Sequence, residues 1–237
     1  VNDTNFTINP TTGVLTNNTI LQINTYNVKV TATDPSGNSF NSTGTIIVDD
    51  TLDPVFITAL SDQTVEFASE RVLQTLSAVD AAGIAGYFVD DDTNFSLDEL
   101  TGVFTNNTQL AVGVYNLQVI AVDNHVLQTL DTGTITVVDT TKPAVFASVI
   151  PASTEFNSNV AIRVNVTDLS PISKVFAVVD GVYNQMTLET GNRFLVTLTS
   201  PSVGTHNVQY LVNDTYNNVN SSLTDSFNVV DTTKPAV

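Results

Sequence analysis

The side chains that most often perform chemistry in proteins are scarce or unpaired in this sequence. Its 237 residues contain no cysteine and only two histidines, His125 and His206, far apart in the chain. Neither a zinc cluster nor a serine triad can be assembled from them. Acidic residues are plentiful, so paired carboxylates for glycoside hydrolysis are not excluded by counting, but nothing marks one pair. We therefore expect no catalytic site and a protein that is not an enzyme.

The acidic run Asp90-Asp91-Asp92 could form half of a metal-binding loop. The corresponding residues 1–3, located 89 positions earlier, are Val-Asn-Asp. A turn that exposes polar side chains to water explains the run without a metal, and we favour that interpretation.

Asparagine-linked glycosylation is the modification for which the sequence carries a signal. The pattern of asparagine, any residue, then serine or threonine occurs more often than the about five or six times that composition alone predicts. Asn5 and Asn17 recur as Asn94 and Asn106, although duplication of a domain also produces that recurrence. Occupied sites would imply export across a membrane. The acceptor positions are Asn2, Asn5, Asn17, Asn41, Asn94, Asn106, Asn165, Asn213 and Asn220.

The charge balance restricts the partners. The 24 acidic and 7 basic residues give a formal net charge of −17, which favours cations or basic surfaces over phosphate backbones, so we expect no nucleic-acid binding. No run of 18 apolar residues occurs, and no signal segment heads the chain. A membrane anchor, if there is one, lies outside this window.

One domain-sized segment occurs more than once. Phe6 and Phe95 lie 89 positions apart, as do Gly13 and Gly102, and the intervening residues align without a gap. A solenoid turn has a period of about 20 to 50 residues, so a period of this length is one small domain repeated.

Aspartate–threonine pairs mark the domain limits. They occur at 50–51, 139–140 and 231–232, and a proline follows each pair. Proline has no amide hydrogen to give to a sheet, so it suits a linker. We predict a complete domain at 51–139, a second one at 140–231, and the C-terminal half of a domain at 1–50. Residues 232–237 are expected to be a linker or the start of a further strand or domain of a tandem array.

Strand signals dominate the chain. Residues 26–33 alternate between apolar and polar side chains, and residues 115–121 and 160–166 carry similar alternating apolar positions. Short strands separated by Asn, Asp, Gly and Pro predict an all-β fold of tandem seven-stranded Greek-key β-sandwiches in an elongated rod. Tyr115 stands where such folds have a tyrosine corner, and His206 takes that place in the third domain.

Three segments resemble known families. Residues 95–103 and 115–123, followed by a strand ending at 139, resemble a cadherin-like domain and related immunoglobulin-like modules of archaeal and bacterial surface proteins, and residues 1–139 carry this pattern twice. Residues 140–231 resemble a different immunoglobulin-type module, with Val-Thr-Asp at 166–168 and Tyr-Leu-Val-Asn-Asp at 210–214. The Asp-Thr-Thr-Lys-Pro linkers at 139–143 and 231–235 are similar to those of large prokaryotic surface proteins.

Cadherin linkers bind calcium, so the resemblance implies a calcium site at the first junction. Calcium takes six to eight oxygen ligands. Asp50, Asp53, Asp80 and Asp123 match the positions of family ligands, whereas positions 52 and 82 carry leucine and alanine where the family has ligands. Hydrated surface acids without a metal explain the same residues, and both interpretations stay open.

At the second junction fewer matching residues are present. Glu66, Asp139 and Asp168 correspond to ligands, but Lys142 stands where a further ligand is expected. Because the positively charged ammonium repels a divalent cation, a calcium site is less expected at this junction than at the first.

Residues 1–50 supply only the later strands of a sandwich, which leaves Phe6 and Tyr26 without an opposing sheet. Either the missing strands precede Val1 in a longer polypeptide, or a neighbouring molecule donates them by strand addition. In the second case residues 233–237 are the candidate donor, and subunits would join head to tail into an open filament.

Two functions follow from this reasoning. The first is a non-enzymatic structural repeat unit and rigid spacer of an extracellular assembly, a prokaryotic surface layer or filament, whose partners are copies of itself or neighbouring domains. The second is an adhesin or binding module that holds glycans or proteins through loops such as 34–42, 90–94 and 180–186. Both place the chain at the cell surface.

Overall fold

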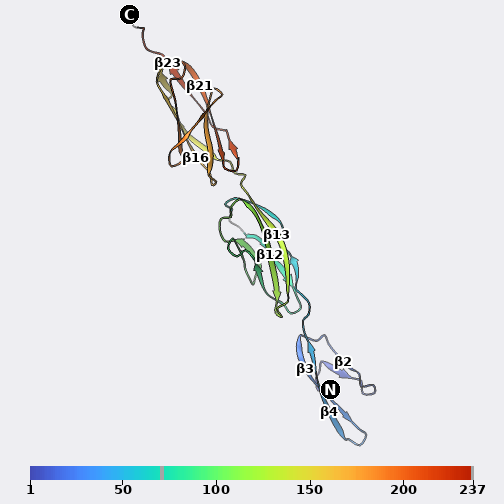
Figure 1. Ribbon diagram of the computed structural model, residues 1–237. Helices are drawn as coiled ribbons and strands as arrows, with labels where there is room; N and C mark the ends of the chain where they lie inside the picture. Colours follow the sequence, from blue (N-terminus) through green and yellow to red (C-terminus); the bar gives the residue numbers. More distant parts are fainter. Residues whose placement is uncertain (70–71, 236–237) are drawn as a thin grey trace. The chain divides into compact units, whose positions relative to one another are not determined.

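All regular structure in the described part of the chain is β-strand. The structure, a computed structural model, describes residues 1–69 and 72–235, and no helix occurs among them (Figure 1). The predicted all-β fold is therefore confirmed. None of these residues forms a helix that is long and apolar enough to span a membrane.

The first module consists of two antiparallel hairpins. One pairs β1 with β2 and the other pairs β3 with β4. The long hairpin stays in register over its full length, from Asn24 opposite Val48 to Thr33 opposite Ser39. The strands are β1 (Phe6–Ile8), β2 (Leu15–Asn17), β3 (Asn24–Thr33) and β4 (Ser39–Val48).

The middle module has one four-stranded sheet of order β6-β13-β12-β9, a three-stranded sheet of order β10-β11-β7, and the pair β5-β8. Two strands of this sandwich are each interrupted and form two short segments. The first gives β5 and β6, which belong to different sheets, and the second gives β7 and β8, which only Leu76 separates. The strands are β5 (Val55–Thr58), β6 (Gln63–Glu66), β7 (Val72–Thr75), β8 (Ser77–Val79), β9 (Ile84–Val89), β10 (Phe95–Leu97), β11 (Val103–Asn106), β12 (Gly113–Asp123) and β13 (Gln128–Val138).

The third module has a sheet of order β14-β16-β20-β19 and a second sheet of order β15-β23-β21-β17-β18, with β22 paired to β21. The alternating face predicted for residues 160–166 is fully buried, because Val160, Ile162 and Val164 are 0% exposed. The strands are β14 (Ala144–Val149), β15 (Ser153–Glu155), β16 (Val160–Thr167), β17 (Ile172–Val179), β18 (Val182–Gln185), β19 (Thr187–Thr190), β20 (Arg193–Leu198), β21 (Gly204–Asp214), β22 (Val219–Asn220) and β23 (Thr224–Val230).

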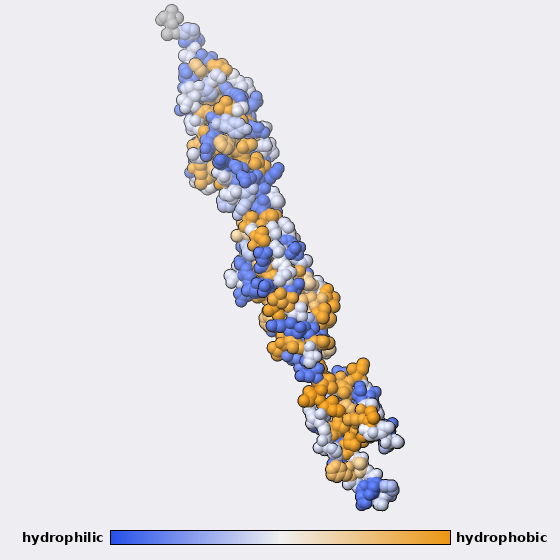
Figure 2. All heavy atoms as spheres, turned by 45° about the vertical axis from the view of Figure 1, so that its right-hand side comes forward, coloured by the Kyte–Doolittle hydropathy of each residue, from blue (hydrophilic) through white to orange (hydrophobic). Residues whose placement is uncertain are grey.

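The repeated positions are less buried in the first module than in the middle one. Phe104 and Ala121 are inaccessible to solvent, whereas the matching Leu15 is half-buried and Ala32 is exposed. In the middle module β11 pairs with β7 and β12 pairs with β9, but among the described residues β2 and β3 have no such partners. Figure 2 shows apolar surface on the first module, whose exposed side chains include Phe40.

Contacts divide the chain into two compact units. The first comprises Val1–Gln63, Glu70–Thr108 and Tyr115–Ile135, and the second comprises Thr64–Ser69, Gln109–Val114 and Thr136–Val237. Each group of acidic residues described below lies within one unit.

A histidine takes the position of the tyrosine corner in the third module. In the first module the Tyr26 hydroxyl donates to the carbonyl oxygen of Gln22 at 2.9 Å, four residues upstream. In the third module His206 Nε2 lies 2.8 Å from the carbonyl oxygen of Ser202, also four residues upstream, and Nδ1 lies 2.6 Å from Asp180 Oδ2. The Ser202 carbonyl raises the pKa of His206 above its ordinary value, burial opposes this effect, and Asp180 adds to it.

Stability of the third module should fall as pH rises through the raised pKa of His206. A histidine whose pKa is higher in the folded state contributes its full stabilisation below its unfolded pKa, near 6.5, and loses it above the folded pKa. Melting temperatures between pH 5.5 and 8.5, measured with chelator present, should therefore fall for the native chain and stay flatter for Asp180→Asn. The control is His125→Gln, which removes the exposed histidine outside the third module. A flat native curve would contradict this expectation.

Candidate metal centres

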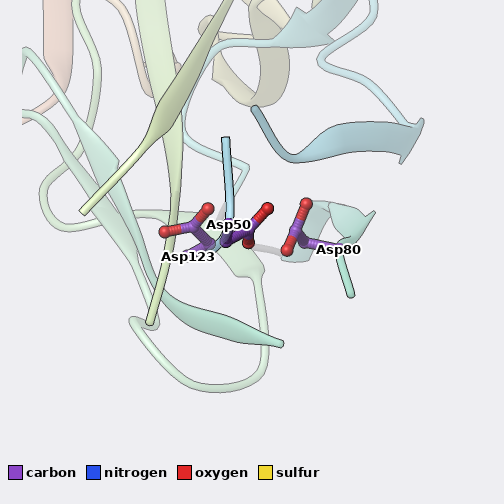
Figure 3. A group of neighbouring side chains, drawn as sticks. All are labelled: Asp50, Asp80 and Asp123. Carbon is purple, nitrogen blue, oxygen red and sulfur yellow. The ribbon is translucent and has the colours of Figure 1, made fainter. Parts of the chain in front are cut away.

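Three aspartates from separate segments of the first unit come together beside the linker that enters the middle module. Asp50 follows β4, Asp80 follows β8, and Asp123 ends β12. One carboxylate oxygen of each lies within 4.8 Å of the others, and Figure 3 shows Asp50 between Asp123 and Asp80. Of the four residues that the sequence predicts at this junction, the structure brings these three together. Asp53 is exposed and lies outside the group.

Local turns orient each of these carboxylates. Each aspartate accepts a hydrogen bond on Oδ1 from the backbone amide two residues further along the chain, which is the geometry of an Asx turn. This hydrogen bond fixes the orientation of the side chain through Oδ1 and does not use Oδ2. The donors are the amides of Leu52 to Asp50 (3.2 Å), Ala82 to Asp80 (2.7 Å), and His125 and Leu127 to Asp123 (2.7 and 2.9 Å).

Two of the three aspartates have a buried oxygen without a hydrogen-bond partner. These atoms are Asp50 Oδ2 and Asp123 Oδ2, and Asp123 is only 1% exposed. A buried carboxylate oxygen without a partner is energetically unfavourable, and three carboxylates in one place also repel one another. Both penalties would be removed by a cation among them.

A second group of three aspartates lies within the second unit, beside the linker that enters the third module. It joins Asp139, which follows β13, to Asp168 after β16 and Asp214 at the end of β21. Asp139 and Asp214 are buried, at 8% and 1% exposed. Asp139 Oδ2 and Asp168 Oδ2 have no hydrogen-bond partner.

The second group is built in the same way as the first. Oδ1 of each aspartate again accepts from the amide two residues further along, and Asp214, like Asp123, accepts from a second amide four residues further along. The donors are the amides of Thr141 to Asp139 (3.1 Å), Ser170 to Asp168 (2.9 Å), and Tyr216 and Asn218 to Asp214 (2.7 and 2.9 Å). Two sandwiches of different type therefore orient three carboxylates with the same local turns.

One difference separates the two groups. Asp123 Oδ2 has no partner, whereas Asp214 Oδ2 accepts a hydrogen bond from the Asn218 side chain at 2.8 Å. Burial raises the pKa of Asp214, but the hydrogen bonds from Asn218 and from the Tyr216 amide outweigh burial and hold the pKa below its ordinary value. Asp214 therefore stays ionised and keeps its negative charge in the group.

The two residues that the sequence singles out at the second junction, Glu66 and Lys142, lie outside this second group. Both carboxylate oxygens of Glu66 accept hydrogen bonds from threonines of the linker. Lys142 is exposed and forms no ion pair with the described residues, so its ammonium does not occupy a ligand position. Asp214, absent from the sequence-based set, completes the group instead. Its signal was the acid that ends the run 210–214, in the position that Asp123 has in the middle module.

The other sequence-based candidates do not form a site among the described residues. Asp91 binds the amide and side chain of Asn94 at 3.0 and 2.8 Å, so the acidic run at 90–92 forms a turn, as expected. His125 is exposed and is far in sequence from the buried His206.

Each group matches the chemistry of a hard divalent cation. Calcium prefers carboxylate and carbonyl oxygens, takes six to eight of them, and tolerates irregular geometry. In each group the three carboxylates supply part of such a shell, two of them through a buried oxygen without a hydrogen-bond partner, and water or backbone carbonyls can complete it. The donor sets contain no nitrogen or sulfur ligand, which argues against zinc.

Comparisons with known proteins give limited similarity. No family model matches the sequence. An uncharacterized 81.3 kDa protein of Acholeplasma phage L2 is 36% identical over 126 residues, which cover 49% of this chain but only 15% of the phage protein. The chain therefore spans a small part of that relative.

Several solved structures are similar in fold. Human CDH23 EC21-23 is 17% identical over 96% of this chain and 81% of its own, with a TM-score of 0.45. Protocadherin Gamma B7 extracellular cadherin domains 1-4 are 20% identical over 94% of this chain and 63% of their own, with a TM-score of 0.41. Titin domains z1z2 in complex with telethonin are 16% identical over 78% of this chain and 100% of their own, with a TM-score of 0.48.

Strand order, rather than these likenesses, defines the class, since each TM-score lies below 0.5. In both complete modules the first strand is divided between the two sheets, and the last two long strands pair in one sheet. The described part of the chain is a tandem array of β-sandwich modules.

Proposed function

We propose that the chain is a non-enzymatic structural unit of an extracellular assembly, such as a prokaryotic surface layer or filament. In this proposal the sandwiches, with limits at 1–50, 51–139 and 140–231, act as spacers, and their partners are copies of the chain or neighbouring modules. Calcium bound by the three-aspartate groups stiffens the segments that enter the middle and third modules.

One observation carries the proposal. In two modules of different type, the aspartate that follows the last strand of the preceding module lies within 4.8 Å of two aspartates of the next. A cation held there ties the linker to the module that it enters. The same arrangement recurs without any catalytic set beside it in the described residues, which supports a mechanical role over a chemical one.

Native assemblies and the purified chain together test this function. Electron microscopy of native material should show ordered polymers with a fixed axial repeat. Small-angle scattering of the purified chain should give a narrower distribution of intramolecular distances with calcium than with chelator, because a stiffer linker samples fewer conformations. Dispersed monomers in native material and identical scattering curves would contradict the proposal.

Glycosylation is proposed at the exposed acceptors and not at every acceptor. Asn2, Asn17 and Asn41 are exposed, whereas Asn220 is half-buried and its side-chain amide donates to the Pro143 carbonyl at 2.8 Å. A glycan attached to the Asn220 amide would clash with the linker at Pro143 and break this hydrogen bond. Mass spectrometry of glycopeptides from the native protein should find Asn17 and Asn41 occupied and Asn220 unmodified. An occupied Asn220 would contradict this prediction.

A specific surface of the third module favours the second candidate function, glycan binding by an adhesin. A shallow concavity on the sheet of β17, β21 and β23 is lined by polar side chains that include Asp180, Asn207, Gln209 and Asp225. Tyr183 of β18 is 64% exposed beside it, opposite Val178, and such an aromatic ring can stack on a sugar. A glycan array probed with the chain should give a signal that Tyr183→Ala reduces if this function holds.

A further inference from the structure

A glutamate that is not part of the second aspartate group holds the linker beside it. Glu66 ends β6, and its two carboxylate oxygens accept three hydrogen bonds from consecutive linker residues. The Thr140 amide and the Thr141 hydroxyl donate to Oε1 at 2.8 and 3.0 Å, and the Thr140 hydroxyl donates to Oε2 at 2.8 Å. We call this arrangement the threonine clamp. Because both oxygens are engaged, Glu66 does not point a free oxygen at Asp139, Asp168 and Asp214.

The threonine clamp recurs in the third module. Glu155 ends β15, and it accepts from the Thr232 amide at 2.7 Å, the Thr232 hydroxyl at 2.9 Å and the Thr233 hydroxyl at 3.3 Å. Around this second clamp the described residues contain no group of three acids. The clamp therefore forms from the glutamate and the Asp-Thr-Thr sequence alone, independently of an aspartate group.

The clamp constrains the aspartate that precedes the threonines. The Thr141 amide donates to Asp139 Oδ1 at 3.1 Å, and the matching Thr233 amide donates to Asp231 Oδ1 at 3.0 Å. Asn218 fixes the other side of Asp139 by donating to its carbonyl oxygen at 3.0 Å. With the backbone and Oδ1 held, the Asp139 carboxylate, whose Oδ2 has no hydrogen-bond partner, stays close to the carboxylates of Asp168 and Asp214.

We propose that Glu66 is a positioning residue that acts through Thr140 and Thr141 to orient Asp139 for a divalent cation, and that it is not itself a ligand. This inference depends on the proposed calcium role of the second group. The matching cadherin position implies the opposite assignment, with Glu66 bound directly to the metal. The two assignments differ in the expected effect of removing the threonine hydroxyls.

Calcium titration by calorimetry tests the assignment on the full chain carrying Asp123→Asn, which silences the first group. Adding Thr140→Val and Thr141→Val removes two of the three hydrogen bonds to Glu66 and leaves its carboxylate in place. Loss of a residue that orients a ligand lowers metal affinity about 10- to 100-fold, so we expect at least a tenfold loss here. Glu155→Gln alters the second threonine clamp, which has no aspartate group beside it, and should leave calcium affinity unchanged.

Each outcome supports or overturns the inference. An affinity that is unchanged or higher in the valine variant overturns it, because a carboxylate freed from the threonines would then be serving as a ligand. Calcium binding by the chain with Asp123→Asn, followed by loss with the valines, supports it. No binding by the chain with Asp123→Asn overturns both the calcium role at the second group and the clamp assignment. Binding without any valine effect overturns the clamp assignment alone.

Discussion

Calcium at saturating concentration should raise the melting temperature of the chain by about 10 °C or more above its value in chelator. A ligand present at 100 times its dissociation constant stabilises the folded state by about 2.7 kcal/mol. For a module of this size, 1 kcal/mol shifts the melting temperature by roughly 4–8 °C. Asp123 Oδ2 and Asp139 Oδ2, both buried without a partner, are the atoms for which the ion replaces missing interactions. Scanning calorimetry with calcium and with chelator measures the shift.

Substitution of the buried Asp123 should change the melting temperature in opposite directions in chelator and in calcium, which a general loss of stability would not do. Asp123→Asn keeps the oxygen that accepts from the His125 and Leu127 amides and removes one of three clustered negative charges. In chelator this variant should melt at or slightly above the native temperature, whereas in calcium it should melt lower. Asp53→Asn changes an exposed acid of the same linker and should keep the full calcium shift. If the melting temperature of the native chain were the same in calcium and in chelator, neither aspartate group would be a calcium site.

The fold could be predicted because its signals are local. Alternation over residues 160–166 places every second side chain on one face, and the structure buries that face completely. The place of His206 in the third module was also predictable, because a glycine two residues earlier and a strand after it mark the corner, and the hydrogen bond to Ser202 confirms the prediction. The two-sheet division of β5 and β6 was not predictable, since both segments carry similar strand signals.

The aspartate groups were only partly predictable because they depend on which segments meet in space. Asp50, Asp80 and Asp123 follow from matching the sequence to a family pattern, and the structure brings them together. Asp214 was missed because the third module is of a different type and does not align with the 89-residue repeat. Lys142 occupies a ligand position in the alignment, but its side chain is exposed, and an alignment does not show side-chain direction.

Gly102→Ala should destabilise the middle module by about 3 kcal/mol. Gly102 has φ +69°, and a Cβ atom there would lie 2.3 Å from the carbonyl oxygen of Leu76. That oxygen belongs to the backbone, and the Leu76 amide already donates to the Gly102 carbonyl at 2.8 Å, so neither segment can move away freely. Left-handed backbone strain contributes about 1 kcal/mol for a residue with a side chain, and overpacking contributes about 1–3 kcal/mol more. Native-state hydrogen exchange should show reduced protection of β10 and β11.

The chain contains its own control for this substitution. Gly13 is the repeat partner of Gly102 and has φ +74°, but a Cβ atom there meets nothing within 4 Å. Gly13→Ala should therefore show only the backbone strain, about 1 kcal/mol, measured by hydrogen exchange in β1 and β2. The difference between the two variants isolates the contact with Leu76, which exists because the segment between β7 and β8 lies against the turn before β11. Equal losses at both glycines would contradict this expectation and would mean that another segment covers β2 as β7 covers β11.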